Sequence, residues 1–260
     1  MTQVVFFDVD GTLLSHKLNA VPQSTRRVLE ELKEKGIRRV VATGRHKMEL
    51  SKLPVRDIEF DGYITLNGLL CLDGEGGLIA GNPIVGEEKE RILRLFREKT
   101  LPLMLVEQDA MYLNFVNEHV VLAQQAISTP IPPLGEYTGN EIYMAVAFVA
   151  QEEAAKLTDL LPGCKITEWN QYGVDIISRS GGKAAGIRAY LEHTGIDRED
   201  TVAFGDGEND IEMLEYVRIG VAMGNGGDRL KACADYVTSS VDEDGIATAF
   251  ERLKPLELCD

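Results

Sequence analysis

The sequence predicts an α/β protein, with a three-layer, Rossmann-like parallel-sheet core into which an α+β domain is inserted. Three observations carry this prediction. Short apolar runs alternate with helical patterns at both ends of the chain, which is typical of parallel strands joined by right-handed crossovers. The middle of the chain instead repeats a helix-strand-strand pattern, which favours an antiparallel sheet covered by helices. The length of 260 residues is sufficient for a core domain and a smaller insert.

The first elements follow from apolar patterning and from residues that stop helices. Residues 4–10 are a run of Val and Phe that ends in Asp-Val-Asp-Gly, which predicts a buried strand entering a tight loop. Residues 22–35 are amphipathic and are followed by Gly36, so we expect a helix there. Residues 39–42 and 63–66 are the next two predicted strands.

The remaining elements fall into two groups that define the domains. The C-terminal third alternates helices and strands like the N-terminal part, with predicted elements at residues 183–193, 201–204, 209–216, 219–223, 236–239 and 246–253. The middle predicts helices at 87–97 and 152–160 and strands at 103–106, 111–115, 142–149, 165–169 and 174–178, with a Pro-rich connection at 129–133. We therefore expect a core domain of residues 1–82 and 182–260 and an inserted domain of residues 83–181.

Charge and composition narrow the class of function. The net charge of −15 argues against a nucleic-acid partner, because binding phosphate backbones needs Lys and Arg in excess. The same charge would repel an anionic substrate, so a bound cation is expected at any phosphate site. The four cysteines are scattered without metal-binding spacing, and no signal peptide or membrane span is apparent. We expect a cytoplasmic protein with no membrane partner.

Two carboxylates follow the first predicted strand. Asp8 and Asp10 are two positions apart, and residues at this spacing in a strand share a face, so both side chains can point into one cleft. Gly11 lets the chain turn sharply after them. An Asp-rich turn without function is the alternative. A calcium loop fails on pattern, because Asn19 and not Glu occupies the twelfth position.

Three further stretches carry polar groups suited to phosphate chemistry. Thr43-Gly44-Arg45 ends a predicted strand with a hydroxyl and an unobstructed backbone N–H. Gly181-Gly182-Lys183 places an ammonium group at the start of a helix. Residues 205–210, Gly-Asp-Gly-Glu-Asn-Asp, put Asp206 and Asp210 around another helix start. Alone, the first stretch favours a plain turn and the second a surface lysine, and the third is equally compatible with an acidic N-cap.

In this order, the four stretches resemble the motifs of the haloacid dehalogenase superfamily of phosphohydrolases, over the whole chain. Residues 8–12 match the first motif, Thr43 the second, Lys183 the third and residues 205–210 the fourth. The insert of about a hundred residues resembles the type-two cap of the Cof-like subfamily, and residues 64–68 are similar to a segment usual in that subfamily.

The resemblance implies a Mg²⁺-dependent phosphatase for a small phosphorylated metabolite, such as a sugar phosphate. Asp8 would be the nucleophile that forms an aspartyl-phosphate, and Asp10 the general acid and base. Mg²⁺ would bind Asp8, the backbone carbonyl of Asp10, and Asp206, with Asp210 ligating through water or orienting the site. The phosphoryl group would be bound by Thr43, Gly44, Lys183 and Asn209.

Electrostatics independently favours the cation. Two carboxylates about 4 Å apart repel by roughly 4 kcal/mol at an effective dielectric constant of 20. Up to four converge here, and Lys183 alone cannot offset that charge.

Other readings use the same residues. A phosphotransferase or mutase would replace water with a sugar hydroxyl. A non-catalytic receiver module would keep a phosphorylated aspartate, but Asp10 argues against it, because an acid/base group beside the nucleophile promotes turnover. Gly224-Asn225-Gly226-Gly227 lacks the spacing of a dinucleotide site, and we expect a plain loop.

The insert would set specificity, and its contacts are the least determined part. Possible substrate contacts are Arg45, Tyr112, Asn114 and Trp169, with core packing as the alternative for the residues of the insert. His46 and Glu107 could also contact a leaving group, although His46 is expected to be exposed at a helix start. The sequence does not determine the oligomeric state.

Overall fold

The computed structural model describes residues 2–126 and 129–253. The chain divides into two compact units, one formed by Met1–Ala80 with Gly182–Asp260 and the other by Gly81–Gly181. The first boundary, at 80/81, lies two residues before the expected 82/83, and the second coincides with the expected 181/182. Below, the first unit is called the core unit and the second the inserted unit.

The core unit is built on an eight-stranded sheet with the order β13-β12-β11-β1-β2-β3-β4-β5. Strand β1 (Val4–Phe7) pairs in parallel with β2 (Arg38–Ala42) and with β11 (Thr201–Gly205). The parallel part extends through β3 (Gly62–Thr65), β12 (Ile219–Ala222) and β13 (Tyr236–Val237). The edge is formed by β4 (Leu70–Asp73), antiparallel to β3, and by β5 (Leu78–Gly81).

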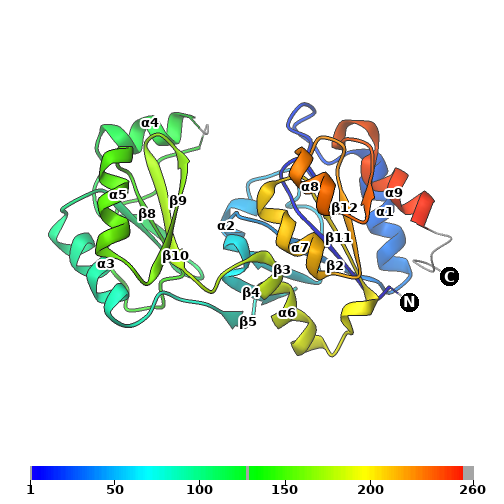
Figure 1. Ribbon diagram of the computed structural model, residues 1–260, viewed down its shortest axis with the longest axis horizontal. Coiled ribbons are helices and arrows are strands. Elements are labelled where there is room, and N and C mark those ends of the chain that lie inside the picture. Colours follow the sequence, from blue (N-terminus) through cyan, green and yellow to red (C-terminus); the bar gives the residue numbers. More distant parts are fainter. Residues whose placement is uncertain (1, 127–128, 254–260) are drawn as a thin grey trace. The chain divides into compact units, whose positions relative to one another are not determined.

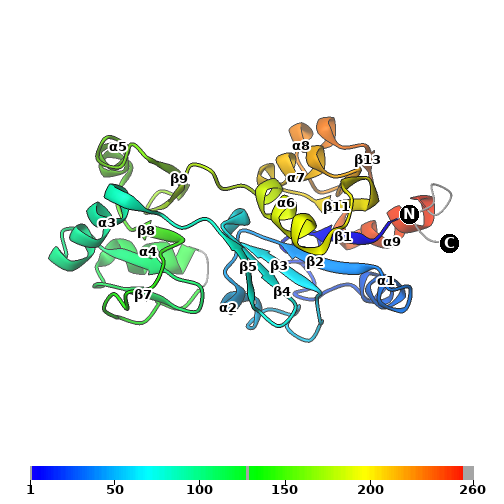
Figure 2. The same ribbon diagram turned by 90° about the horizontal axis from the view of Figure 1, so that it is seen from below.

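Helices cover both faces of this sheet, so the predicted three-layer α/β core is confirmed (Figures 1 and 2). On one face, α1 (Gln23–Glu34) and α9 (Gly245–Leu253) pack in a cluster that contains Val5 and Phe7. On the other, α6 (Lys183–Thr194), α7 (Ile211–Tyr216) and α8 (Asp228–Cys233) pack in a cluster that contains Val4 and Phe6. The period-two alternation of β1 buries each of its side chains in one of two cores.

The inserted unit contains a five-stranded sheet with the order β7-β6-β8-β10-β9. Its strands are β6 (Leu103–Val106), β7 (Met111–Leu113), β8 (Met144–Ala147), β9 (Cys164–Asn170) and β10 (Gly173–Ser178), and all paired neighbours are antiparallel. Its own apolar core joins this sheet to α3 (Gly86–Glu98) and α5 (Gln151–Leu160). The predicted repeat of a helix followed by two strands is therefore present twice.

Within residues 2–126 and 129–253, the sequence patterns miss two β-strands and two α-helices. They are β4, β5, α8 and α4 (Glu118–Ala126). Three have at most six residues, too few to show a period, and α4 carries its apolar residues without the clear stripe that marks an amphipathic helix.

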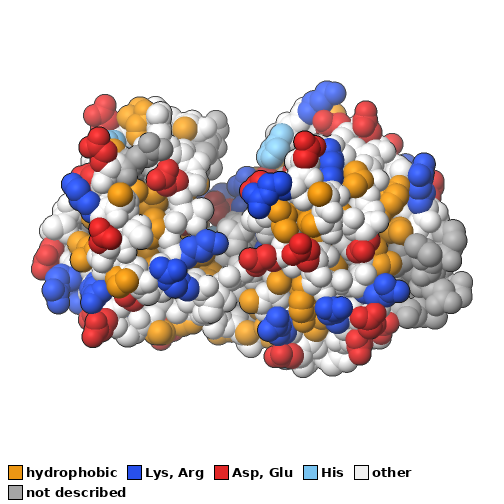
Figure 3. Space-filling model, viewed as in Figure 1, with side chains coloured by type: hydrophobic (Ala, Val, Ile, Leu, Met, Phe, Trp, Pro, Cys, Tyr) orange, Lys and Arg blue, Asp and Glu red, His pale blue; other side chains and the backbone are white. Residues whose placement is uncertain are grey.

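The surface carries charges of both signs. On the face shown in Figure 3, acidic and basic side chains are interspersed over each unit.

Among the described helices, none combines the length and apolar character that a bilayer crossing requires.

Candidate active site

Three of the four predicted motifs meet at one edge of the core sheet. Asp8 follows β1, Thr43 follows β2 and Asp206 follows β11, and these three strands are neighbours. Because the strands are parallel, their carboxyl ends bring the following residues together.

The remaining motif, the third in sequence order, adds a buried lysine between two aspartates. Lys183 Nζ donates to Asp8 Oδ1 at 2.6 Å and to Asp210 Oδ1 at 2.5 Å. All three side chains are almost completely removed from solvent. Although burial lowers the pKa of Lys183, attraction by Asp8 and Asp210 outweighs it and raises this pKa above its usual value. The lysine therefore stays charged, and its burial between two carboxylates excludes the alternative of a surface lysine.

A close backbone contact fixes where Lys183 emerges. Helix α6 begins at Lys183, directly after Gly182. Gly68 lies against this start, with φ of +86°, and a Cβ on it would come within 1.9 Å of the Gly182 carbonyl oxygen. Only glycine accommodates both the left-handed backbone and this approach. The loop after β3 thus sets the position of the lysine.

Asp206 and Asp210 lie in one turn but use their carboxylates differently. Asp210 Oδ2 accepts from the backbone N–H groups of Asp206, at 3.0 Å, and Gly207, at 2.9 Å. With Lys183 on its other oxygen, Asp210 is positioned to orient the turn and the lysine. Asp206 is half-buried, and its Oδ1 accepts a hydrogen bond from Thr12 Oγ1 at 3.0 Å.

The carboxylates of Asp8, Asp206 and Asp210 fit a divalent cation. Each offers an oxygen within 4.8 Å of the other two. Burial, with added repulsion from Asp210, raises the pKa of Asp8 to about 7 and that of Asp206 to about 6. Burial and mutual repulsion both disfavour the charged carboxylates, and a bound cation would offset both effects. Carboxylate oxygens are the hard donors that Mg²⁺ and Ca²⁺ prefer.

Asp10 has a partner different from that of Asp8. Arg45 donates to both of its oxygens, from Nε at 2.5 Å and from Nη2 at 2.8 Å, and His16 Nε2 lies 3.5 Å from Oδ1. The argument that both carboxylates share a strand face was wrong, because β1 ends at Phe7 and the chain turns through Gly11, with φ of +82°. The two carboxylates are placed by a loop.

The predicted phosphate-binding groups line the same edge. The Thr43 hydroxyl oxygen accepts from the Arg45 backbone N–H at 3.1 Å, an acceptor role that leaves its hydrogen to donate. Asn209 is exposed and donates from Nδ2 to Asn67 Oδ1 at 3.0 Å. Gly44 is tight against the same Asn67, since a Cβ on it would lie 3.2 Å from Oδ1.

Sequence reasoning gave no site role to Thr12, Asn67 or Asn225. Asn225 Nδ2 donates to Gly11 O at 2.9 Å and to Asp206 Oδ2 at 3.1 Å, so the glycine-rich stretch around it is more than a plain loop. Two signals were available, because Thr12 lies in the first motif and Asn67 in the segment 64–68 that is similar to one usual in the Cof-like subfamily. Asn67 has left-handed backbone, with φ of +53°. Asn tolerates this conformation better than most residues.

Two candidate contacts in the inserted unit are corrected by the structure. Tyr112 is buried, and its hydroxyl donates to Glu107 Oε1 at 2.5 Å. Burial, followed by that carboxylate, raises the pKa of Tyr112 to about 12. Asn114 is also buried and uses its amide on the backbone, donating to Phe96 O and Leu101 O and accepting from the N–H of Leu103. Both side chains hold the inserted unit together.

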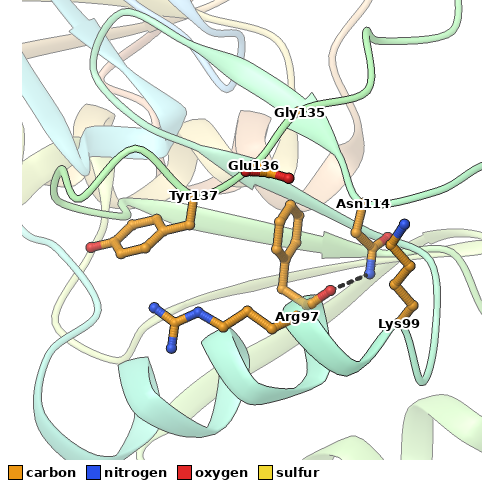
Figure 4. A pocket seen from close by; sticks show the side chains of 7 residues that line it. Arg97, Lys99, Asn114, Gly135, Glu136 and Tyr137 are labelled. Carbon is orange, nitrogen blue, oxygen red and sulfur yellow. Dashed lines mark hydrogen bonds between the residues drawn. The ribbon is translucent and has the colours of Figure 1, made fainter.

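Asn114 also borders a cavity of about 270 Å³ within the inserted unit (Figure 4). The other lining residues are Phe96, Arg97, Lys99, Gly135, Glu136 and Tyr137. None of them belongs to the four motifs.

The remaining candidates have mixed outcomes. His46 is fully buried, so the expected exposure is wrong; its Nδ1 accepts from the Met48 N–H and caps α2 (Lys47–Leu50). Glu107 is buried and accepts hydrogen bonds within the inserted unit. Trp169 is half-buried, edge-to-face with Phe148 at 6.3 Å between ring centroids, and stays a candidate contact.

An α/β core with a buried lysine and clustered aspartates at the carboxyl edge of its sheet defines a phosphohydrolase site with an inserted domain. The haloacid dehalogenase-like hydrolase model matches residues 5–250, and the chain belongs to this family, in its Cof-like branch. Several of its relatives are named phosphatases, and this protein is accordingly an enzyme that hydrolyses phosphoric monoesters. The receiver-module alternative is thereby set aside.

Specific relatives cover almost the whole chain. A Bacillus subtilis (strain 168) protein named as a phosphatase, YkrA, is 35% identical over 97% of this chain and 98% of its own length. The pyridoxal phosphate phosphatase YbhA of Escherichia coli (strain K12) is 28% identical over 95% and 96%. A solved structure described as the subclass IIB sugar phosphatase BT4131 is 35% identical, with a TM-score of 0.78, over 97% and 99%.

Proposed function

We propose that this phosphatase removes the phosphoryl group from a small phosphorylated metabolite through an aspartyl-phosphate on Asp8, with Mg²⁺ as cofactor. The observation that carries the proposal is the buried Asp8–Lys183–Asp210 arrangement beside Asp206. It offers a nucleophile, a fixed cation and an acidic cluster that calls for a divalent ion. The relatives named as pyridoxal phosphate and sugar phosphatases support the substrate class.

In the first step, an Asp8 carboxylate oxygen attacks phosphorus in line with the leaving oxygen. The new bond joins Asp8 to phosphorus as the bond from phosphorus to the leaving oxygen breaks. Asp10 gives that leaving oxygen a proton. Lys183, Thr43, Gly44 and Asn209 hold the transferring group from the edge where the structure collects them.

In the second step, water attacks the same phosphorus atom and Asp10 takes its proton. The bond between Asp8 and phosphorus breaks, so that inorganic phosphate and free Asp8 are restored. In the described geometry both oxygens of Asp10 accept hydrogen bonds from Arg45. When Asp10 carries the proton, one of these hydrogen bonds weakens, because a carboxylic acid hydroxyl is a poorer acceptor than a carboxylate oxygen. We therefore propose that Arg45 orients Asp10, in preference to a role in contacting the leaving group directly.

Asp8, Asp206 and the backbone carbonyl of Asp10 are the groups proposed to hold Mg²⁺, with Asp210 orienting the turn. Four aspartates and two cations, Lys183 and Arg45, give this site a formal charge of −2 before substrate arrives. When bound, a divalent cation neutralises phosphoryl oxygens and orients them for attack.

We further propose that the inserted unit acts as a cap that sets specificity, with Trp169 as a candidate contact. No nucleic-acid or membrane partner is proposed, in keeping with the net charge of −15. A cytoplasmic location fits the free state of the described cysteines, Cys71, Cys164 and Cys233.

The test is a hydrolysis screen over phosphorylated metabolites, with sugar acceptors in parallel reactions to reveal phosphoryl transfer. Wild type with Mg²⁺ should release phosphate, while the EDTA-treated enzyme and Asp8→Asn should not. Re-addition of Mg²⁺ should restore phosphate release by the EDTA-treated enzyme and should not restore it in Asp8→Asn. Hydrolysis that survives in Asp8→Asn would reject the nucleophile, and hydrolysis that survives metal removal would reject the cofactor.

A further inference from the structure

The loop between β12 and α8 reaches the acidic cluster from a part of the chain outside the four motifs. This loop contains Gly224-Asn225-Gly226-Gly227. Its backbone is fixed by hydrogen bonds from Gly224 N to Ser239 O and from Gly226 N to Met223 O, both at 2.9 Å. The loop is therefore a defined turn that presents one polar side chain, Asn225.

Asn225 uses both ends of its amide. On one side, Oδ1 accepts a hydrogen bond from the Val241 backbone N–H at 2.9 Å. On the other, Nδ2 donates to Gly11 O at 2.9 Å and to Asp206 Oδ2 at 3.1 Å. One side chain thus connects three segments far apart in sequence: the loop after β1, the loop after β11 and the 3₁₀ turn Val241–Glu243.

These bonds give each oxygen of the Asp206 carboxylate one donor and leave further lone pairs for a cation. Thr12 donates to its Oδ1 and Asn225 to its Oδ2, so that neither oxygen can rotate without losing a partner. Gly11 closes on the same carboxylate, since a Cβ there would lie 2.2 Å from Oδ2. Both donors are neutral, and a neutral donor orients a carboxylate while leaving its negative charge for a cation. Lys183 acts differently on Asp8 and Asp210, because it brings a positive charge.

We infer that Asn225 is a positioning residue of the cation site, which holds the Asp206 carboxylate in its ligating orientation and anchors it to the 3₁₀ turn Val241–Glu243. This inference rests on the proposed function, in which Asp206 ligates a divalent cation. A purely structural role for Asn225 would tie the loops together and have no specific effect on the cation.

Cation binding to the substrate-free protein separates these roles. Mg²⁺ binding is measured by titration calorimetry on wild type, Asn225→Ala, Asn225→Gln and Asp206→Asn, and the thermal midpoint of each is measured without metal. Asn140→Ala is the matched control, because Asn140 also donates from Nδ2 to a carboxylate, Glu107 Oε2 at 3.1 Å, but within the inserted unit. Orienting partners of metal ligands typically change affinity by about 10- to 100-fold.

The inference predicts that Asn225→Ala weakens Mg²⁺ binding at least about tenfold. Asn225→Gln, which keeps an amide, should recover part of the loss, and Asn140→Ala should bind Mg²⁺ like wild type. Wild-type affinity in folded Asn225→Ala would overturn the inference, as would equal losses in Asn225→Ala and Asn140→Ala. If Asn225→Ala does not fold, Asn225→Gln decides: full loss of binding in a folded Gln variant contradicts the inference. If wild type and Asp206→Asn bind Mg²⁺ alike, the cation assignment in the proposed function fails first.

Discussion

Lys183 shows how a single side chain carries both folding and chemistry. A lysine this deeply buried stays charged only because Asp8 and Asp210 contact it. The same contacts hold the proposed nucleophile in place. Stability and activity are therefore coupled at this residue.

Lys183→Met should accordingly destabilise the protein strongly. It leaves two carboxylates buried without their cation, and breaking a buried pair in this way costs about 3–5 kcal/mol. The free energy of unfolding, measured by denaturant titration at pH 8, gives the loss. Lys33→Met is the control, since Lys33 pairs with Glu59 at an exposed position, where a pair is worth about 0–1 kcal/mol. Similar losses in both variants would contradict the account.

Arg45 makes a prediction about leaving groups. Arg45 orients the Asp10 carboxyl group through two hydrogen bonds, so Arg45→Ala should leave Asp10 poorly positioned to donate its proton. This loss matters most when the leaving alkoxide is a poor leaving group. The variant should lose about 10- to 100-fold in kcat on an alkyl phosphomonoester and clearly less on p-nitrophenyl phosphate. Equal losses on the two substrates would show that Arg45 acts through the phosphoryl group instead.

At the scale of elements, the site depends on loops that touch one another. The loop after β3 carries Gly68 against Gly182, and this contact places the start of α6 and therefore Lys183. Gly68→Ala should lower the unfolding free energy by more than about 2 kcal/mol and reduce kcat, because it adds a clash to the cost of a left-handed backbone.

Gly195→Ala is the matched control for Gly68→Ala. Gly195 also has positive φ, at +72°, but a Cβ there meets nothing within 4 Å. Gly195→Ala should lower the unfolding free energy by only about 1 kcal/mol and should keep the wild-type kcat. If both variants lose the same stability and Gly68→Ala keeps full activity, the contact does not position the lysine.

The same scale explains what the sequence could predict. Strands with clear apolar runs and helices with glycine stops were found, because their signals lie within a few consecutive residues. Asn225 was missed as a site residue because its contacts reach Gly11 and Val241, which only the fold brings near. His46 was placed at a helix start, but its burial depends on packing that no local pattern encodes.

At the scale of the whole molecule, protons and metal compete for one acidic cluster. The pKa of Asp8 is raised to about 7 and that of Asp206 to about 6, above the ordinary value of 3.8. Between the ordinary pKa of 3.8 and these raised values, the folded state binds protons that the unfolded state has already released. The contribution of both groups to stability therefore falls as the pH rises through this range.

The metal-free protein should thus gain stability from the site as the pH is lowered from 8 to 5. Unfolding of EDTA-treated protein across this range measures the effect, and Asp206→Asn should show a shallower dependence. The difference between wild type and Asp206→Asn is the quantity to compare, because the large negative net charge, −15 in wild type, also makes the stability of both proteins depend on pH. Mg²⁺ should stabilise most at pH 8, where fewer protons compete. Identical pH dependence in wild type and Asp206→Asn would remove the site from this explanation.

The central claim, that Asp8 becomes phosphorylated, is tested most directly by trapping the intermediate. Asp10→Asn is mixed with p-nitrophenyl phosphate and Mg²⁺, since this leaving group departs without a proton while hydrolysis of the phosphoenzyme still lacks its base. The reaction is quenched in acid, and the peptides are analysed by mass spectrometry. The account predicts a phosphoryl group on the peptide containing Asp8, absent when Asp8→Asn is added to the variant. Phosphorylation of another residue, or full-speed turnover with no phosphorylated peptide, would contradict it.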